Sequence, residues 1–143
     1  MTEVEMCNST GYLIAQVCKS HRNKAGELLA EVDLYVGQEM FLLPLWKQDG
    51  LNLTQLSEHL CVQQATTSRM LERIEKSGLV KRIKDPDDGR VSLVYLTEEG
   101  RSLLEPIVKL WKEVEEIMMA DFTFEERLLF RRLLIQVYNN LSV

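Results

Sequence analysis

The sequence of residues 53–97 is LTQLSEHLCVQQATTSRMLERIEKSGLVKRIKDPDDGRVSLVYLT, and this stretch decides the fold. It begins with a predicted helix that Thr54 can cap, followed by a turn at residues 61–63. A second helix then runs toward Gly78, which is placed to end it. The inner face of this helix carries residues at helical spacing, namely Thr67, Met70, Leu71 and Ile74. The polar residues on the opposite face are therefore available for binding.

Two short runs rich in β-branched residues come next, at 79–84 and 91–96. Between them lies the charged loop 85–90, in which Gly89 is expected to act as a hinge. Helix, turn, helix and hairpin in this order form a winged helix-turn-helix, a fold that places its second helix in a DNA major groove. The expected fold class is therefore mainly α with a small β-hairpin wing.

The chain before this core is predicted to be helical. The first eight residues are polar and are expected to be frayed, and a helix is expected over residues 9–31. A second helix, buried and rich in large apolar residues, is expected over residues 36–47. Pro44 lies inside it and is expected to kink it, because proline lacks the amide hydrogen that would bond to residue 40.

The chain after Thr97 is also predicted to be helical. Thr97 can cap a helix that carries an apolar stripe at coiled-coil spacing, formed by Leu104, Ile107, Trp111, Val114 and Met118. A last helix is expected to begin at a capping box, Thr123 with Glu126. The stripe needs a partner surface, and a single chain of this length offers too little of it, so a homodimer is expected.

Length and composition favour one folded domain with its own core. Apolar residues make up 45% of the 143 residues, yet no apolar run is long enough for a membrane span and no leader peptide is evident. A cytoplasmic protein without membrane contact is therefore expected. The three cysteines are widely spaced, which predicts reduced thiols rather than disulfides or a zinc site.

Charge is unevenly distributed along the chain. The whole chain has a formal net charge of −5, whereas residues 66–84 hold six basic and two acidic residues. Acidic residues are concentrated toward the two ends. A basic segment on an acidic body favours binding to DNA in one orientation over general coating of nucleic acid.

The hairpin and the second helix carry a family pattern. The hairpin has Asp-x-Arg, a strand ending in Leu-Thr and a helix with an early glycine, at Asp88, Arg90, Val94, Leu96, Thr97 and Gly100. The second helix and first strand match at Thr66, Arg69, Arg73, Glu75, Gly78, Leu79, Val80 and Arg82. Gln38 also matches, whereas Tyr35, Pro44 and Cys61 depart from the pattern. With these residues the chain resembles the MarR family of bacterial winged-helix transcription regulators.

The resemblance implies a single domain over residues 1–143, with a winged helix-turn-helix core at about 36–97. It implies dimerisation helices at about 9–31 and 98–142 that intertwine in a homodimer, with both wings on one face of double-stranded DNA. Two-fold symmetry then requires a palindromic operator. In many relatives a small-molecule pocket lies between the dimer helices and the winged lobes. The expected function is a sequence-specific DNA-binding transcriptional regulator, a repressor released by a small-molecule effector.

Ten residues are candidates for DNA contact. Arg69 and Arg73 lie one helical turn apart on the outward face, where they can reach bases or phosphates or form a solvated basic surface. Arg90 is expected in a narrow minor groove with Asp88 supporting its guanidinium; the alternative is an exposed salt bridge of little energetic value. The full set is Thr54, Gln64, Ala65, Thr66, Ser68, Arg69, Arg73, Arg82, Asp88 and Arg90.

The trigger for release has two candidates. The residues expected to bind a small-molecule effector are Tyr12, His21, Met40, Leu43 and Trp46, although aromatic residues at helical spacing are usually core. The alternative is a thiol-based redox sensor at Cys18 or Cys61, while Cys18 is more simply expected to pack as a small hydrophobe. His21 and His59 lack partners at metal-ligand spacing, so no metal or cofactor is expected.

Two other classes of function fit less well. A winged helix used only for protein–protein contact has no need of Arg69, Arg73 and Arg90, all of which are present. An enzyme needs a nucleophile–base pair, a glycine-rich phosphate loop or a carboxylate couple, and none stands out in the sequence. No enzymatic activity is therefore expected.

Overall fold

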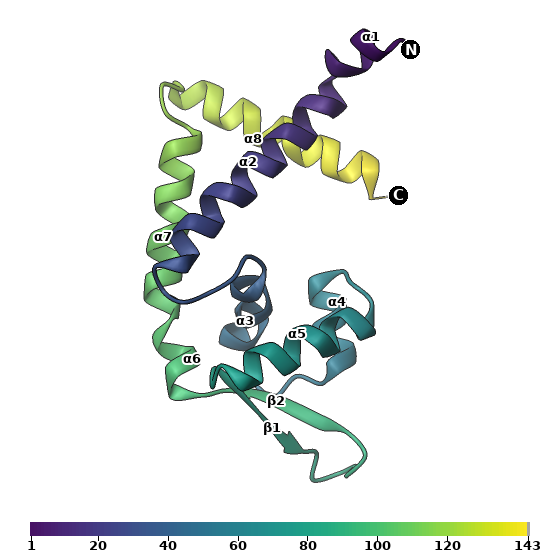
Figure 1. Ribbon diagram of the computed structural model, residues 1–143, viewed down its shortest axis with the longest axis vertical. Coiled ribbons are helices and arrows are strands. Elements are labelled where there is room, and N and C mark those ends of the chain that lie inside the picture. Colours follow the sequence, from purple (N-terminus) through teal and green to yellow (C-terminus); the bar gives the residue numbers. More distant parts are fainter. Residues whose placement is uncertain (143) are drawn as a thin grey trace. The chain divides into compact units, whose positions relative to one another are not determined.

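A computed structural model describes residues 1–142 of the protein. The fold is mainly α with one β-hairpin, as the sequence predicts. The elements drawn in Figure 1 are α1 (Glu3–Cys7), α2 (Thr10–Ala30), α3 (Gln38–Lys47), α4 (Leu53–Leu60), α5 (Gln64–Lys76), β1 (Val80–Lys84), β2 (Ser92–Leu96), α6 (Glu98–Ser102), α7 (Leu104–Met118) and α8 (Phe124–Leu141). They form two compact units, which meet within α7 between Trp111 and Lys112. Among the described residues, no helix combines the length and apolar character needed to cross a membrane.

The helix-turn-helix consists of α4, a turn at residues 61–63, and α5. Asn52 caps α4 through a capping box: its side chain accepts the amide of Gln55 at 2.9 Å, and the Gln55 side chain accepts the amide of Asn52 at 2.9 Å. The prediction that Thr54 caps this helix is therefore wrong. Cys61 follows the helix in the left-handed conformation, with a φ of 55°.

A Schellman motif ends α5 at Gly78, as the sequence predicts. Gly78 has a φ of 78°, its amide donates to the carbonyl of Glu75, and the amide of Leu79 donates to the carbonyl of Ile74. Gly89, the other expected hinge, does not have a positive φ. The loop of the hairpin therefore does not depend on the conformational freedom of glycine, and that expectation is wrong.

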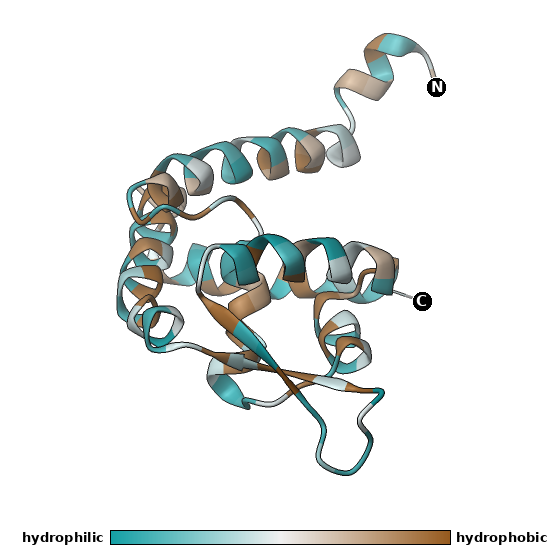
Figure 2. Cartoon of the chain, turned by 60° about the horizontal axis from the view of Figure 1, so that its bottom comes forward, coloured by the Kyte–Doolittle hydropathy of each residue, from teal (hydrophilic) through white to brown (hydrophobic). Residues whose placement is uncertain are grey.

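The β-hairpin forms the wing. Its antiparallel pairs are Val80–Leu96, Lys81–Tyr95, Arg82–Val94, Ile83–Leu93 and Lys84–Ser92. Leu51 forms a bridge on the other side of β2, because the amide of Val94 donates to the carbonyl of Leu51 at 2.8 Å. β2 is thus held on both sides, and the loop that joins the two strands is hydrophilic (Figure 2).

The core of the first unit lies where α3, α4, α5 and β2 pack together. The largest side chains with almost no exposure are Leu29, Phe41, Leu42, Leu45, Leu56, Ile74 and Val94. α3 begins at Gln38, two residues later than predicted, after Gly37 with a φ of 96°. It continues through the buried Pro44 and ends at Lys47, as predicted. This packing supports the helix-turn-helix from behind.

Two helical predictions differ from the structure. The first residues form α1 rather than a frayed segment, because Thr2 and Glu5 make a capping box. The helix after Thr97 stops at Leu103, giving α6 and α7 where the sequence predicts one helix. Pro106 explains the break, because proline lacks the amide that would bond the carbonyl four residues earlier.

α8, in the second unit, keeps its apolar side chains at the surface. It begins with the predicted capping box of Thr123 and Glu126. None of the residues in α8 is buried, and its most exposed apolar side chains are Phe124, Leu128, Leu129, Ile135, Tyr138 and Leu141. The predicted stripe on α7 is divided: Ile107 and Val114 are buried, whereas Leu104, Trp111 and Met118 are more than one third exposed. A large apolar surface is thus left uncovered within one chain.

Candidate nucleic-acid interface

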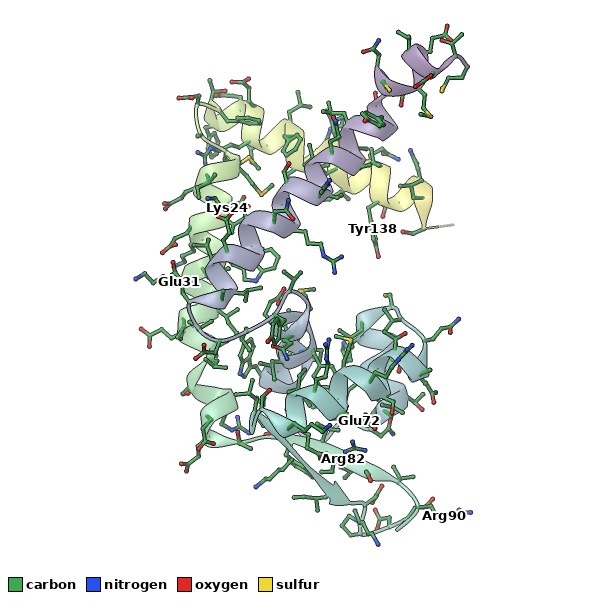
Figure 3. All side chains as sticks on the ribbon, viewed as in Figure 1. Lys24, Glu31, Glu72, Arg82, Arg90 and Tyr138 are labelled. Carbon is green, nitrogen blue, oxygen red and sulfur yellow. The ribbon has the colours of Figure 1, made fainter. Side chains whose placement is uncertain are left out.

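α5, which we call the recognition helix, has an apolar and a polar face as the sequence predicts. Its buried residues are Thr67, Leu71 and Ile74. The exposed residues are Gln64, Ala65, Arg69, Glu72 and Arg73, while Thr66 and Ser68 are half-buried. Glu72, one of these exposed residues, is labelled on the recognition helix in Figure 3. Within residues 1–142, neither Arg69 nor Arg73 takes part in an ion pair, so both guanidinium groups are available.

Two side-chain pairs join α4 to the recognition helix. The hydroxyl groups of Ser57 and Thr67 share a hydrogen bond of 2.8 Å in the buried interface. At the surface, Nε2 of Gln64 donates to Oγ1 of Thr54 at 3.2 Å. The two helices are therefore fixed against each other, and two predicted DNA-contacting residues touch.

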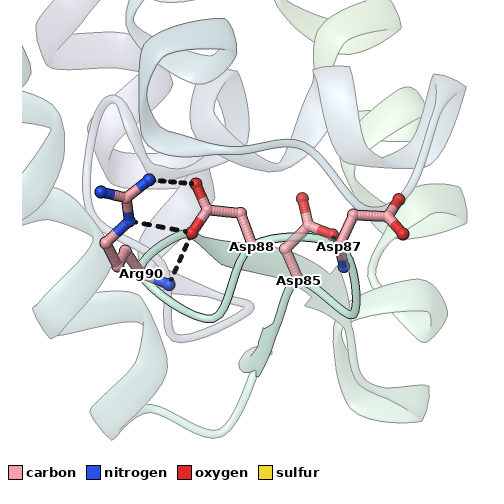
Figure 4. A network of polar contacts seen from close by, with 4 residues as sticks. All are labelled: Asp85, Asp87, Asp88 and Arg90. Carbon is pink, nitrogen blue, oxygen red and sulfur yellow. Dashed lines mark hydrogen bonds and ion pairs between the residues drawn. The ribbon is translucent and has the colours of Figure 1, made fainter.

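The tip of the wing is ordered by aspartate side chains (Figure 4). Nε of Arg90 donates to Oδ1 of Asp88 at 3.1 Å, and Nη2 donates to Oδ2 at 3.3 Å. Asp85 accepts the amide of Asp87 at 2.9 Å on the other side of the loop. The hydrogen bonds from the Arg90 side chain and amide lower the pKa of Asp88 below its ordinary value, because they stabilise the charged carboxylate. The Arg90 side chain is nevertheless 91% exposed, so its guanidinium is oriented and accessible at once.

Arg82, on β1, has a partner within the protein. Its Nε donates to Oε2 of Glu75 at 3.0 Å, which joins the wing to the recognition helix. Figure 3 shows Arg82 on the hairpin, away from Arg90 at the tip. The sequence names Arg82 as a candidate DNA contact and Glu75 only as part of the family pattern. It does not predict that the two residues touch, because their contact depends on how the hairpin folds back. Arg82 therefore positions the wing in addition to carrying charge.

A groove of about 340 Å³ opens between α4, the recognition helix and the wing. Four of the ten predicted DNA-contacting residues line it: Thr54, Ser68, Arg82 and Arg90. The others lie along the recognition helix, except Asp88 at the wing tip. Exposed lysines at positions 76, 81 and 84 add positive charge to the same elements. The structure thus brings together residues from three segments on one basic surface.

The five predicted effector-binding residues come from α2 and α3. Those with exposed side chains are Tyr12, Met40 and Leu43. The ring of His21 packs against Trp111 with 5.6 Å between ring centroids. Trp46 donates its indole Nε1 to the carbonyl of Gly100 at 3.2 Å, which gives this side chain a structural role.

Glu39 is a buried acid that the sequence analysis does not single out. It is 5% exposed, and its Oε2 accepts the amide of Gly37 at 3.0 Å. Burial raises the pKa of Glu39, while backbone hydrogen bonds and the nearby His21 lower it by less. The only signal in the sequence is an acid among the apolar residues of α3.

The raised pKa of Glu39 makes stability depend on pH. Its stabilising contribution is complete below its pKa in the unfolded chain, near 4.5, and is lost as pH rises through the raised value in the folded protein. Glu39→Gln should therefore be more stable than the wild type at pH 8, with the difference shrinking on acidification. Urea unfolding of both proteins at several values between pH 8 and about pH 4.5 measures this difference in the free energy of unfolding. Glu116→Gln, at an exposed position, is the control. A difference that does not change with pH would contradict the prediction.

All three cysteines are exposed, and in the described part of the chain they form no disulfide. The expectation that Cys18 packs as a small hydrophobe is therefore wrong within the single chain. Within residues 1–142, no three His, Cys, Asp or Glu side chains lie close enough together to hold a metal ion. Redox sensing at Cys18 or Cys61 stays a prediction.

Comparison with known proteins places this architecture among transcriptional regulators. The MarR family profile matches residues 34–92. The chain is 32% identical over 107 residues to the transcriptional regulator HosA of Escherichia coli O111:H-, covering 75% of this chain and 79% of HosA. It is 27% identical to the HTH-type transcriptional regulator YsmB of Bacillus subtilis (strain 168), covering 85% and 83%. The crystal structure of the S. aureus MepR–DNA complex superimposes with a TM-score of 0.84 and 25% identity, covering 92% and 98%.

Proposed function

The chain belongs to the MarR family of transcriptional regulators, and on this premise we propose that it is a sequence-specific repressor, acting as a homodimer on a palindromic operator. The observation that carries the proposal is the groove in which α4 and the recognition helix meet Arg82 and Arg90 of the wing. A helix that contacts bases in the major groove, beside an arginine in the minor groove, reads the duplex from both sides. The related MepR was crystallised with DNA, which supports this use of the surface.

A homodimer is proposed because the apolar side chains of α8 need a cover. Leu134 and Tyr138 are 43% and 67% exposed, and Tyr138 projects from α8 in Figure 3. Burying apolar surface contributes about 25 cal/mol per Å² to stability. The exposed apolar side chains along α8 therefore favour association with a partner that covers them. A second copy is the partner proposed, because a two-fold axis also presents two recognition helices to one face of DNA.

We expect the wild type to be a dimer by light scattering at micromolar concentration and to protect two symmetric half-sites about 10 bp apart. Leu134→Glu should give a monomer, because it places a charge in the apolar interface. Its operator affinity should fall by about a hundredfold, since the second half-site no longer contributes. Gln136→Glu adds the same charge at an exposed polar position of α8 and should stay dimeric. A monomeric wild type, or protection of one half-site only, would contradict the proposal.

Release by a small-molecule effector completes the proposal. The two winged helix-turn-helix regions of a dimer bind the operator more weakly when the distance between them changes. A ligand that favours the incompetent spacing by about 2.7 kcal/mol shifts the equilibrium roughly a hundredfold. The five predicted effector-binding residues on α2 and α3 lie in the same unit as the buried Glu39. One of them, His21, lies near Glu39 and packs against Trp111. Polar groups within apolar surroundings favour a ligand over oxidation of the cysteines as the trigger.

A further inference from the structure

Thr54 contacts the first residue of the recognition helix, Gln64. Gln64 is the first residue of this helix, and the N-terminal residues of a recognition helix are the ones that contact base edges. Its side chain is exposed, yet its Nε2 is held by Oγ1 of Thr54 at 3.2 Å. We propose that Thr54 is a positioning residue that orients the Gln64 amide for bidentate recognition of adenine. The inference rests on the proposed binding of DNA.

The hydrogen-bonding groups that remain on Gln64 match adenine. A glutamine amide has two hydrogens on Nε2 and an acceptor at Oε1. When Thr54 accepts the hydrogen that points away from Oε1, the other hydrogen and Oε1 remain as a donor and an acceptor side by side. Adenine presents N7 as an acceptor and N6 as a donor in the major groove, whereas guanine presents two acceptors. Guanine at this position would face Oε1 with its own O6, and both would lack a donor.

A DNA phosphate would fix the direction of the Thr54–Gln64 hydrogen bond. A threonine hydroxyl can either donate or accept. Thr54 lines the groove that also holds Arg82 and Arg90, and this positive charge attracts the phosphate backbone. Phosphate oxygens only accept, so the hydroxyl hydrogen of Thr54 points to DNA and its oxygen accepts from Gln64. The amide nitrogen therefore stays on the Thr54 side, and the amide cannot turn over.

The scaffold holds Thr54 in place before DNA binds. The capping box of Asn52 and Gln55 fixes the first turn of α4, which contains Thr54. One turn later, Ser57 is hydrogen-bonded to Thr67 of the recognition helix at 2.8 Å. Orientation that exists in the free protein does not have to be created on binding, which lowers the entropic cost.

A complete specificity profile tests the inference. Selection from randomised duplex DNA, followed by sequencing, gives the relative affinity for every base at every position. We expect the wild type and Thr54→Ser to prefer adenine at one position of each half-site by about 5- to 150-fold. Gln64→Ala should lose this preference. Thr54→Val keeps the branched shape but has no hydroxyl, and should weaken the preference about fivefold at that position alone.

A modified base provides a second measurement. 7-Deazaadenine lacks N7, so placing it at that position should weaken wild-type binding about fivefold and leave Gln64→Ala unaffected. A uniform loss of affinity with Thr54→Val that leaves the adenine preference unchanged would make Thr54 a phosphate contact only and overturn the inference. A preference for another base at the position that Gln64→Ala affects would also overturn it. A wild type that selects no sequence would instead overturn the proposed function itself.

Discussion

Alanine at Gly100 is expected to destabilise the protein by about 3 kcal/mol. Gly100 is buried in α6, where a Cβ atom would overlap the carbonyl oxygen of Leu79 and lie 3.2 Å from a methyl group of Leu96. The carbonyl of Leu79 accepts the amide of Thr97 at 3.1 Å, so it cannot move away without weakening a backbone hydrogen bond. The carbonyl of Gly100 also accepts the indole of Trp46. Displacing α6 would therefore disturb the wing and α3 together.

Urea unfolding followed by circular dichroism measures this loss. Gly89→Ala is the matched control, because a Cβ atom there meets nothing within 4 Å and the backbone does not have a positive φ. The control should change stability by no more than about 0.5 kcal/mol. Equal effects of the two substitutions would show that α6 can accept a side chain at this position.

Arg90→Ala and Arg69→Ala are expected to weaken DNA binding in different ways. Arg90 lies at the wing tip, so its loss should lower affinity for many sequences, most strongly where A/T-rich flanks narrow the minor groove. The slope of log affinity against log salt should decrease by about 1. Arg69 lies on the exposed face of the recognition helix, so its loss should cost about 1–3 kcal/mol at particular operator positions.

Fluorescence anisotropy with a panel of single-base operator variants separates the two effects. Arg22→Ala, at an exposed position of α2, removes the same charge and should leave the base preferences unchanged. If Arg69→Ala and Arg90→Ala both lower affinity uniformly over the panel, Arg69 is a phosphate contact and its role as a base contact is refuted.

Local chemistry made many helix and strand ends predictable. Thr97 and Thr123 cap helices as expected, because each cap bonds an amide only three residues away. Gly78 ends the recognition helix through its own positive φ. The two strands were located to within one residue, because β-branched residues flank a loop rich in Asp, Pro and Gly.

The features that the sequence did not predict depend on competition between neighbouring residues or on contacts between elements distant in the chain. Asn52 and Thr54 are both good caps, and the glutamine at position 55 favours Asn52 by completing a capping box. Pro106 divides the predicted helix although the apolar spacing continues across it. The burial of Glu39 depends on how α3 packs against other elements. The spacing of residues within α3 does not predict that packing.

The sequence suffices to name the residues of the candidate site, whose contact with DNA stays a prediction, but not to predict their arrangement. Helical periodicity alone identifies the outward face of the recognition helix. The pairing of Thr54 with Gln64 joins residues ten positions apart, and the pairing of Arg82 with Glu75 joins residues seven apart. Both depend on the crossing of separate elements, so they follow from the tertiary fold only.

β1 has an open edge with consequences for solubility. Leu51 covers the free side of β2, and within residues 1–142 no strand covers the corresponding side of β1. A bare strand edge can pair with a strand of another molecule, and charged side chains on the edge strand oppose such aggregation. Lys81 and Lys84 lie exposed on β1. These two lysines therefore contribute positive charge to the wing and oppose pairing of its open edge with another molecule. Neutralising them would reduce both the positive charge and the solubility of the protein.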